Sequence, residues 1–570
     1  MKRFFSFQAR VVQLVVFAVI GLAFGGAAFA QSSQPRFASL ESFRGRASVV
    51  RLGNALTLQR GMALQRNDVV VTREGSLVLR FYSDGSSLRV GANSRVQINE
   101  SAGERDIEVF GGRLWARVVS WKERPVRFRT GRTIAAVRGT ELAIEFADDT
   151  TVLSALEGKV HVENDDGSVM VEGGQSAVVE PGKGPQLRTV VRPQDAVQWA
   201  LYFQPVIYEI SGEVVEEGAW QRAVGLSTES YRQGDLEGAL ELMGAVIDTE
   251  VSDSRFFAYR ASLLLAASAV DEAAADIERA LKLDPDSSDA LSLRAIIAVA
   301  GNDSDTALAT ADRAIASDPK SATAQIALAY ARQSVFDLKG ARSALERAVE
   351  LEPDNALAWA RLSELHLAFG KAHDAMNAAE KAVQIEPNLA RTQSVLGYAY
   401  LSKVQTKKAR DAFEKAIALD QGDPLPRLGL GLAKIRDGAL KEGTREIETA
   451  ASLDPGNSLV RSYLGKAYYE QKKVGLDDRE YGLAKGFDPN DPTPWFYDAI
   501  AKQTTNRPVE ALRDMEQAID LNDNRAIYRS RMLLDSDEAA RSASLGRIYS
   551  DLGFQQLGLV EGWSSVNVDP

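Results

Sequence analysis

The sequence contains no cysteine and only three histidines in 570 residues. Without a thiol the chain can form neither a disulfide nor a thiolate metal site, and it has no cysteine nucleophile or cysteine-linked lipid anchor. The motifs of zinc proteases (H-E-x-x-H), α/β-hydrolases (G-x-S-x-G), P-loop nucleotide binding and dinucleotide binding after a strand are also missing. We therefore predict that the protein is not an enzyme and that it uses no cofactor or metal.

Positive charge is scarce in the larger, C-terminal part of the chain. Residues 31–200 carry 23 Lys and Arg against 20 Asp and Glu, a net of +3. The residues after 200 carry 41 basic and 58 acidic side chains, a net of −17. Because binding to nucleic acid needs clustered positive charge, we predict that nucleic acid is not a ligand.

A long apolar run occurs at the N-terminus. Lys2 and Arg3 precede apolar residues 11–24, and the small-residue sequence Ala28-Phe29-Ala30 follows. This order is typical of a secretory signal peptide, so we predict that residues 1–30 are removed after Ala30. The mature protein would then lie in the periplasm or outer envelope of a Gram-negative-type bacterium, without a membrane-spanning segment. The alternative is an uncleaved anchor, since the run approaches the length that spans a bilayer.

Residues 37–181 alternate between apolar and polar side chains with a period of two. Short runs rich in β-branched and aromatic residues are bounded by the turn signals Asp84-Gly85, Gly111-Gly112, Asp166-Gly167 and Gly173-Gly174. This pattern, without a helical stretch, predicts an all-β domain.

The same segment resembles the FecR domain of bacterial envelope proteins that relay iron-chelate signals. The resemblance rests on Thr72-x-x-Gly75, Asp84-Gly85-Ser86, Val137-Arg138-Gly139-Thr140, Leu156-Glu157-Gly158 and Gly173-Gly174-Gln175. FecR-type regulators have a cytoplasmic helical segment that binds a σ factor ahead of a membrane helix. Only ten residues precede the apolar run here, so we expect no direct control of a σ factor.

Basic residues and tryptophans gather between positions 113 and 138. They are Arg113, Trp115, Arg117, Trp121, Lys122, Arg124, Arg127, Arg129, Arg132 and Arg138, with Glu123 as the one acidic residue. One interpretation is a binding surface for an anionic envelope polymer or an acidic protein, because Arg127 and Arg129 would share one face of a strand. The other, which we favour, is a solvated sheet face or one that docks onto the acidic helices that follow.

The second half of the chain repeats with a period of 34 residues. Prolines recur on one lattice at Pro285, Pro319, Pro353, Pro387, Pro455 and Pro489, and Gln421 occupies the missing position. An alanine stands five residues before each of these seven positions: Ala280, Ala314, Ala348, Ala382, Ala416, Ala450 and Ala484. Small residues at this spacing let two antiparallel helices approach closely, and the proline ends the second helix.

This pattern resembles the tetratricopeptide repeat (TPR), which implies an all-α superhelical solenoid with a concave groove that binds peptides or protein segments. We place nine units at residues 218–523 and a divergent unit at 524–570, after a linker at 182–217 that contains a short aromatic helix. Some TPR proteins hold a partner's C-terminal carboxylate with lysines and asparagines. The matching positions here are Ser292, Ile296, Ala360, Glu364, Ser394 and Tyr398, so we expect no such clamp and a basic or amphipathic partner instead.

Taken together, these patterns predict a multidomain envelope scaffold. The TPR groove would capture a protein partner, and the FecR-like domain would offer a second interaction surface. Two alternatives stay open: a FecR-type component that senses an envelope state, and a protein that binds peptidoglycan or polysaccharide through residues 113–138. Pro570 falls where a repeat would close, so we expect the last unit to lack a polar capping helix.

Overall fold

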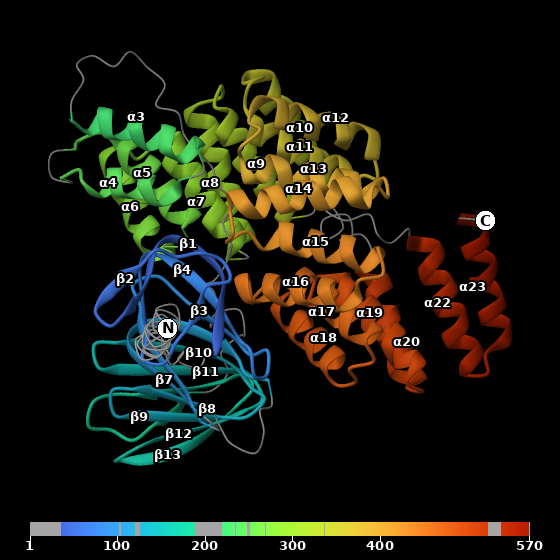
Figure 1. Ribbon diagram of the computed structural model, residues 1–570. Coiled ribbons are helices and arrows are strands. Elements are labelled where there is room, and N and C mark those ends of the chain that lie inside the picture. The colour runs from blue at the N-terminus through green and yellow to red at the C-terminus, as the bar shows by residue number, and fades with distance from the viewer. Residues whose placement is uncertain are drawn as a thin grey trace, which may run out of the picture.

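The computed structural model describes residues 36–101, 104–119, 126–188, 219–233, 235–247, 251–267, 269–301, 303–335, 337–521 and 537–568. The expected signal peptide, the aromatic linker helix and the first part of the divergent unit predicted at 524–570 fall wholly or largely outside these residues. Within the described part, an all-β domain is followed by an all-α helical array (Figure 1). The predicted fold class is confirmed.

Fifteen strands form one continuous sheet in the described β domain. They are β1 (Ala38–Arg51), β2 (Asn54–Leu56), β3 (Ala63–Leu64), β4 (Val69–Phe81), β5 (Ser87–Val90), β6 (Arg95–Ser101), β7 (Glu104–Arg117), β8 (Val126–Thr130), β9 (Thr133–Val137), β10 (Glu141–Ala147), β11 (Thr150–Glu157), β12 (Lys159–Asn164), β13 (Gly167–Glu172), β14 (Gln175–Val179) and β15 (Gln186–Arg188). All neighbouring pairs are antiparallel except β7 and β8. β15 carries the sheet past Pro181, where the sequence pattern had placed the end of the domain.

One of the predicted turns is wrong. Gly111 and Gly112 lie inside β7, which continues to Arg117. The pairing of β6 with β7 shifts register between Arg95 and Val96, and Gly112 has a φ of 96°. A side chain at Gly112 would also come within 2.2 Å of the Ser94 hydroxyl. The glycine pair thus allows a bulge and a close contact between strands rather than a chain reversal.

The two faces of the sheet around β5, β7 and β10 have different roles. Leu88 and Val90 of β5, Leu114 of β7, and Leu142 and Ile144 of β10 point into the β-domain core. The residues between them therefore point to the opposite face, because successive side chains of a strand alternate. That face carries Arg89, Trp115 and Arg117, and all three are buried.

Eighteen described helices, α3 to α20, form nine consecutive antiparallel pairs. They are α3 (Ala219–Arg232), α4 (Leu236–Gly244), α5 (Ser254–Ala266), α6 (Val270–Leu283), α7 (Ser288–Ala300), α8 (Ser304–Ser317), α9 (Ala322–Ser334), α10 (Leu338–Leu351), α11 (Ala356–Ala368), α12 (Ala372–Ile385), α13 (Ala390–Ser402), α14 (Thr406–Leu419), α15 (Pro424–Arg436), α16 (Leu440–Leu453), α17 (Ser458–Glu470), α18 (Leu476–Phe487), α19 (Pro492–Thr504) and α20 (Pro508–Asp520).

The 34-residue lattice is visible in the backbone hydrogen bonds. An acidic residue ends the second helix of seven successive units, and its N–H donates to the lattice alanine four residues earlier at 2.9–3.0 Å. We call these acidic residues the turn carboxylates: Asp284, Asp318, Glu352, Glu386, Asp420, Asp454 and Asp488. The seven alanines are fully buried, so the close helix packing predicted from the period is confirmed.

The array curls around the β domain (Figure 1). The sheet lies below the first helix pairs and beside α16–α18, so two distant parts of the array meet the same domain. α22 (Asp537–Asp551) and α23 (Gln555–Val568) form a hairpin at the far end, where α22 contacts α20. In none of the described helices did we find a stretch with the length and apolarity needed to cross a membrane.

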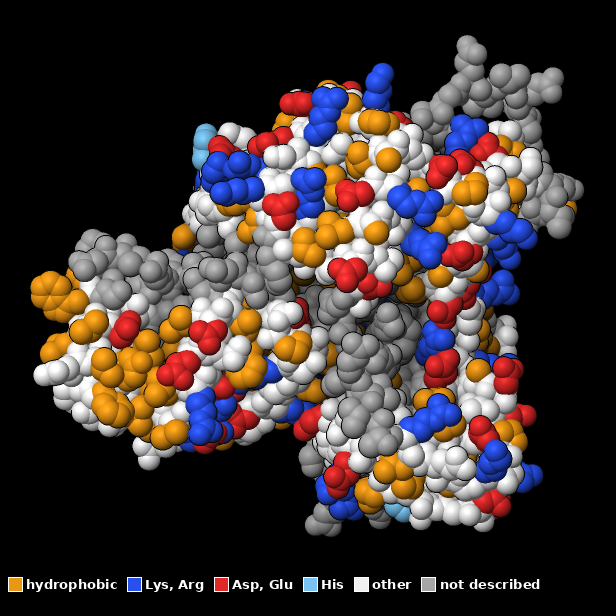
Figure 2. Space-filling model, turned by 180° about the vertical axis from the view of Figure 1, so that it is seen from behind, with side chains coloured by type: hydrophobic (Ala, Val, Ile, Leu, Met, Phe, Trp, Pro, Cys, Tyr) orange, Lys and Arg blue, Asp and Glu red, His pale blue; other side chains and the backbone are white. Residues whose placement is uncertain are grey.

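The terminal hairpin has an apolar outer surface. Leu559, Val560, Trp563 and Val566 of α23 are between 60% and 73% exposed. Gly546 of α22 and Gly558 of α23 instead make the close contact between the two helices. Hydrophobic side chains accordingly gather on the lobe at the left of Figure 2. No polar capping face covers the described part of this unit.

Candidate functional site: the domain interface and the repeat turns

The predicted basic surface at residues 113–138 is divided in the structure. Arg113, Trp115 and Arg117 point from β7 to the helical array. Arg113 pairs with Asp271 at 2.6 Å and with Glu145 at 2.9 Å. Trp115 is fully buried in a cluster with Leu156, Leu483 and Phe487. All three residues contact the helical array, which buries Trp115 and Arg117 and leaves Arg113 partly exposed.

The remaining members of that set do not join them. Arg127 and Arg129 project from β8 on the side away from the buried residues Val126 and Phe128. Arg132 and Arg138 are exposed on either side of β9, and Arg129 lies 3.6 Å from Asp106. Trp121, Lys122 and Arg124 fall outside the described residues. A single surface that combines the tryptophans with the arginines is therefore not formed by the described part of the set.

A buried charge network joins the β domain to α17 and α18. Glu141 of β10 receives hydrogen bonds from Trp115 Nε1 at 3.0 Å and from both terminal nitrogens of Arg461, one of them at 3.0 Å. Arg461 also donates to Glu480 at 2.9 Å. Arg117 completes the network by pairing with Glu480 and with the Tyr468 hydroxyl at 3.1 Å. We call Arg117, Glu141, Arg461 and Glu480 the interface network.

The electrostatics of this network follow from its burial. The side chains of Glu141, Arg461 and Glu480 are 0% exposed. Burial alone would raise the pKa of Glu480, but Arg117 and Arg461 outweigh it and hold that pKa below its usual range. Since a buried ion pair that loses one partner leaves an uncompensated charge, the network couples the two domains strongly.

Further arginines extend the interface along the repeat turns. Arg80 of β4 bonds Glu448 at 2.7 Å and Thr449 at 3.1 Å. Arg89 of β5 donates to the Leu453 carbonyl. Burial lowers the pKa of Arg89 to about 10, and the neighbouring carboxylate of Asp454 opposes that shift.

The first strand also reaches the array. Arg44 of β1 pairs with Asp420 at 2.9 Å, and its side chain is only 5% exposed. Ser42 donates to the Gln421 carbonyl at 2.6 Å. Two of the turn carboxylates, Asp420 and Asp454, therefore face arginines supplied by the β domain.

One lattice position of the sequence marks this interface, although we did not predict it. At 34-residue intervals, positions 359, 393, 427, 461 and 495 hold Trp, Gln, Arg, Arg and Trp. Trp359, Gln393 and Arg461 each donate to the carbonyl of the proline six residues earlier, at 2.8–3.0 Å. Arg427 stands at the same position and reaches the Glu41 carbonyl of β1 at 3.1 Å. Arginine occupies this position in two successive units, where Arg427 and Arg461 contact the β domain.

The six positions that match the carboxylate clamp of other TPR proteins are not accessible. Ser292, Ile296, Ala360, Glu364, Ser394 and Tyr398 are all buried. The first helices of neighbouring units pack on one another, as α7 does on α9 and α11 on α13. Arg361 and Arg391 both pair with Glu364 in a buried cluster.

The accessible hollow lies instead where the repeat turns converge. It has a volume of about 870 Å³ and is lined by the end of α3, the start of α5 and the four turns that precede α7, α9, α11 and α13. We call it the turn hollow. Four turn carboxylates (Asp284, Asp318, Glu352 and Glu386) line it together with Asp286, Asp289 and Asp354, against the basic residues Arg232, Arg255 and Lys320. Its wall is therefore predominantly acidic.

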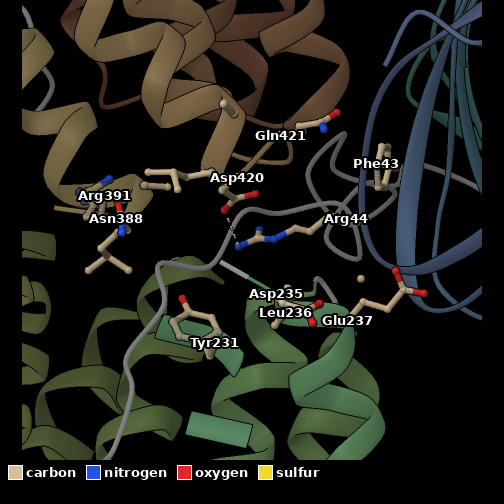
Figure 3. A pocket seen from close by; sticks show the side chains of 15 residues that line it. Phe43, Arg44, Tyr231, Asp235, Leu236, Glu237, Asn388, Arg391, Asp420 and Gln421 are labelled. Carbon is tan, nitrogen blue, oxygen red and sulfur yellow. Dashed lines mark ion pairs between the residues drawn. The ribbon is translucent and has the colours of Figure 1, made fainter. Parts of the chain in front are cut away.

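A second cavity of about 270 Å³ continues the turn hollow toward the β domain, and the two share Tyr231 and Leu389. Figure 3 shows Arg44 in this cavity, with its guanidinium directed at Asp420 and with Tyr231 on the opposite wall. The first unit and the turn before α15 thus face each other across the cavity, and the β domain closes one side of it.

This architecture, a β domain held by the turns of a helical-repeat solenoid, defines a class of protein-binding scaffold. The sequence model described as FecR protein matches residues 68–161. Models of the tetratricopeptide repeat match residues 225–288, 335–397 and 390–423. The chain therefore contains a FecR domain and TPR repeats, as the sequence motifs predicted, and TPR repeats imply protein–protein interaction. A search of curated proteins gave no match.

Solved structures resemble the fold at low sequence identity. The Cut9–Hcn1 hetero-tetramer of the APC/C aligns over 61% of this chain and 75% of its own, with 15% identity and a TM-score of 0.44. A human IFIT1 dimer with PPP-AAAA aligns over 62% and 92%, with 15% identity and a TM-score of 0.40. A putative anti-sigma factor from Parabacteroides distasonis aligns over 24% and 67%, with 17% identity and a TM-score of 0.21.

Proposed function

We propose that this protein is an exported cell-envelope scaffold whose TPR array binds a protein partner. The observation that carries the proposal is the difference between the two ends of the turn row. The β domain occupies the turns at Asp420 and Asp454, whereas the turn hollow beside the first units is open and about 870 Å³ in volume. The signal-peptide pattern of residues 1–30 supports export.

In this proposal the FecR-like domain has two roles. Its β4–β5–β7–β10 face fixes the array, and the outward face of β8 with Arg127 and Arg129 is the second interaction surface. Because the face with Trp115 is buried, contact with a further partner falls to this outward face of β8.

The test uses the full chain in its native envelope. A photo-cross-linking amino acid is placed at position 318 in the turn hollow, or at position 380 on the exposed side of α12 as a matched control. We expect a discrete protein adduct from position 318 and none from position 380. Equal adducts from both positions, or none from either, would contradict the proposal. Export is tested in the same cells by the location and processed size of the chain.

A second candidate function is favoured by the outward arginines of β8. Binding of an anionic envelope polymer needs linear positive charge, which Arg127 and Arg129 provide on one face. Pelleting of the intact protein with purified cell-wall material tests it. Retention that is lost in Arg127→Glu/Arg129→Glu supports polymer binding, and unchanged retention removes it.

A further inference from the structure

The turn carboxylates give seven equivalent acidic positions, one at the end of each second helix from α6 to α18. These positions are equivalent because they recur every 34 residues and share one backbone geometry. In each, the backbone N–H donates to the carbonyl of the lattice alanine. A ligand that one turn accepts is therefore a guide to what the next turn can accept.

The chain itself provides such a ligand at one turn. Arg44 approaches Asp420 from β1, an extended segment, and its guanidinium is buried in the contact. At the following turn, Arg89 of β5 donates to the Leu453 carbonyl beside Asp454. Arginine on an extended segment is thus the chemistry that the turns already bind inside this molecule.

The turns beside the first units carry the same acid without such a cation. In the described part of the chain, Asp284, Asp318, Glu352 and Glu386 form no ion pair with lysine or arginine, although all four line the turn hollow. Burial and the nearby Asp318 also raise the pKa of Asp289 to about 6. A cation in the hollow would relieve this repulsion between like charges.

We propose that the turn hollow binds an extended, arginine- and lysine-rich segment of a partner protein. The arginines and lysines of this segment form ion pairs with Asp284, Asp318, Glu352 and Glu386, in the way that Arg44 pairs with Asp420. The segment follows the row of repeat turns toward the cavity that Arg44 occupies (Figure 3). This inference rests on the proposed function, because it names the chemistry of the partner that the array binds.

The test measures binding of short labelled peptides to the mature chain, residues 31–570, by fluorescence anisotropy. The probes alternate serine with arginine, with glutamate or with leucine. The variant Asp318→Asn/Glu352→Gln removes two hollow charges without changing side-chain shape. The control Asp312→Asn/Glu380→Gln removes two exposed charges from α8 and α12, so its net charge is the same.

We expect the arginine peptide alone to bind, with affinity that falls as salt rises. The hollow variant should weaken binding about tenfold, and the control variant less than about twofold. Equal weakening by both variants, no binding of the arginine peptide, or preference for the leucine peptide would each overturn the inference. If position 318 still cross-links a partner in that case, the proposed function stands and only the basic segment is rejected. If there is neither binding of the arginine peptide nor cross-linking from position 318, the basic segment and the proposed function are both rejected.

Discussion

The two ends of the turn row use one sequence feature in two ways. At Asp318 the carboxylate lies in the open turn hollow, while at Asp420, three repeats further on, it is covered by Arg44 of the β domain. The helix end that presents each carboxylate is the same, with the N–H of Asp318 bonded to Ala314 and that of Asp420 to Ala416. What differs is the segment that lies against the turn.

This difference shows how a repeat array can be made to hold one domain and still present a free site. The covered turns coincide with changes at another lattice position, which holds arginine at 427 and 461 but tryptophan at 359 and 495 and glutamine at 325 and 393. The open turns lack those changes and keep their acid exposed.

The largest effect is expected where the two domains share buried charge. Glu480→Gln removes the carboxylate that pairs with both Arg117 and Arg461, and it leaves these buried guanidinium groups with Glu141 and, near Arg117, Glu448. We expect the free energy of unfolding to fall by about 3–5 kcal/mol, because an uncompensated buried charge is costly. Urea-induced unfolding followed by tryptophan fluorescence measures it.

The matched control is the exposed pair of Arg507 and Glu510 on α20. Glu510→Gln removes the same group from a solvent-screened ion pair, and we expect no measurable change in the unfolding midpoint. Similar midpoints for the Glu480 and Glu510 variants would mean that the interface network does not hold the two domains together.

The second prediction concerns a buried carboxylate that has no arginine. Asp491 caps α19, is 0% exposed, and accepts hydrogen bonds from Ser458 at 2.7 Å and the Thr493 N–H at 2.8 Å. Burial raises its pKa to about 6. Because the folded-state pKa lies above the unfolded one, its ionisation destabilises the fold above pH 6, and that cost disappears as the pH falls toward 4.

Asp491→Asn keeps the cap and removes the charge. We expect the variant to be more stable than the native chain at pH 7.5, by up to about 3 kcal/mol, and equal to it near pH 4. Thermal unfolding of both proteins at the two pH values measures the difference. A stability difference that does not change with pH would show that the Asp491 carboxylate is not desolvated.

The sequence predicts the framework of both domains because local rules decide it. The alanine lattice specifies close helix packing, and each of those alanines is buried as expected. The alternation of β7 predicts that Arg113, Trp115 and Arg117 share one face. Gly111-Gly112 was misplaced because a glycine pair is compatible both with a turn and with a close contact inside a strand, and only the neighbouring Ser94 decides between them.

The docking of the two domains could not be derived in the same way. Arg117 and Glu480 are 363 residues apart, and no local pattern relates them. The alternation of side chains along β7 predicts which of them share one face of the sheet, but it does not predict which element packs against that face. Likewise, the TPR resemblance indicated that Ala360 and Glu364 form no carboxylate clamp, but no local pattern relates Glu364 to Arg391, which pairs with it from the next unit.

The smallest effect is expected from a pair of substitutions that differ only in their place on the lattice. Asp420→Asn should lower the free energy of unfolding by about 1–2 kcal/mol, because it leaves the buried guanidinium of Arg44 without its carboxylate. Asp318→Asn should change it by less than about 0.5 kcal/mol, because that carboxylate is exposed in the turn hollow.

Both asparagines preserve the local turn, since the side-chain oxygen still accepts the N–H two residues on, that of Gly422 or of Lys320, at 2.9 Å. The comparison therefore isolates the covering segment from the turn itself. If the two variants lose equal stability, Arg44 contributes nothing specific at Asp420. The turn row would then offer no precedent for an arginine-bearing ligand in the hollow, whatever its overall acidity.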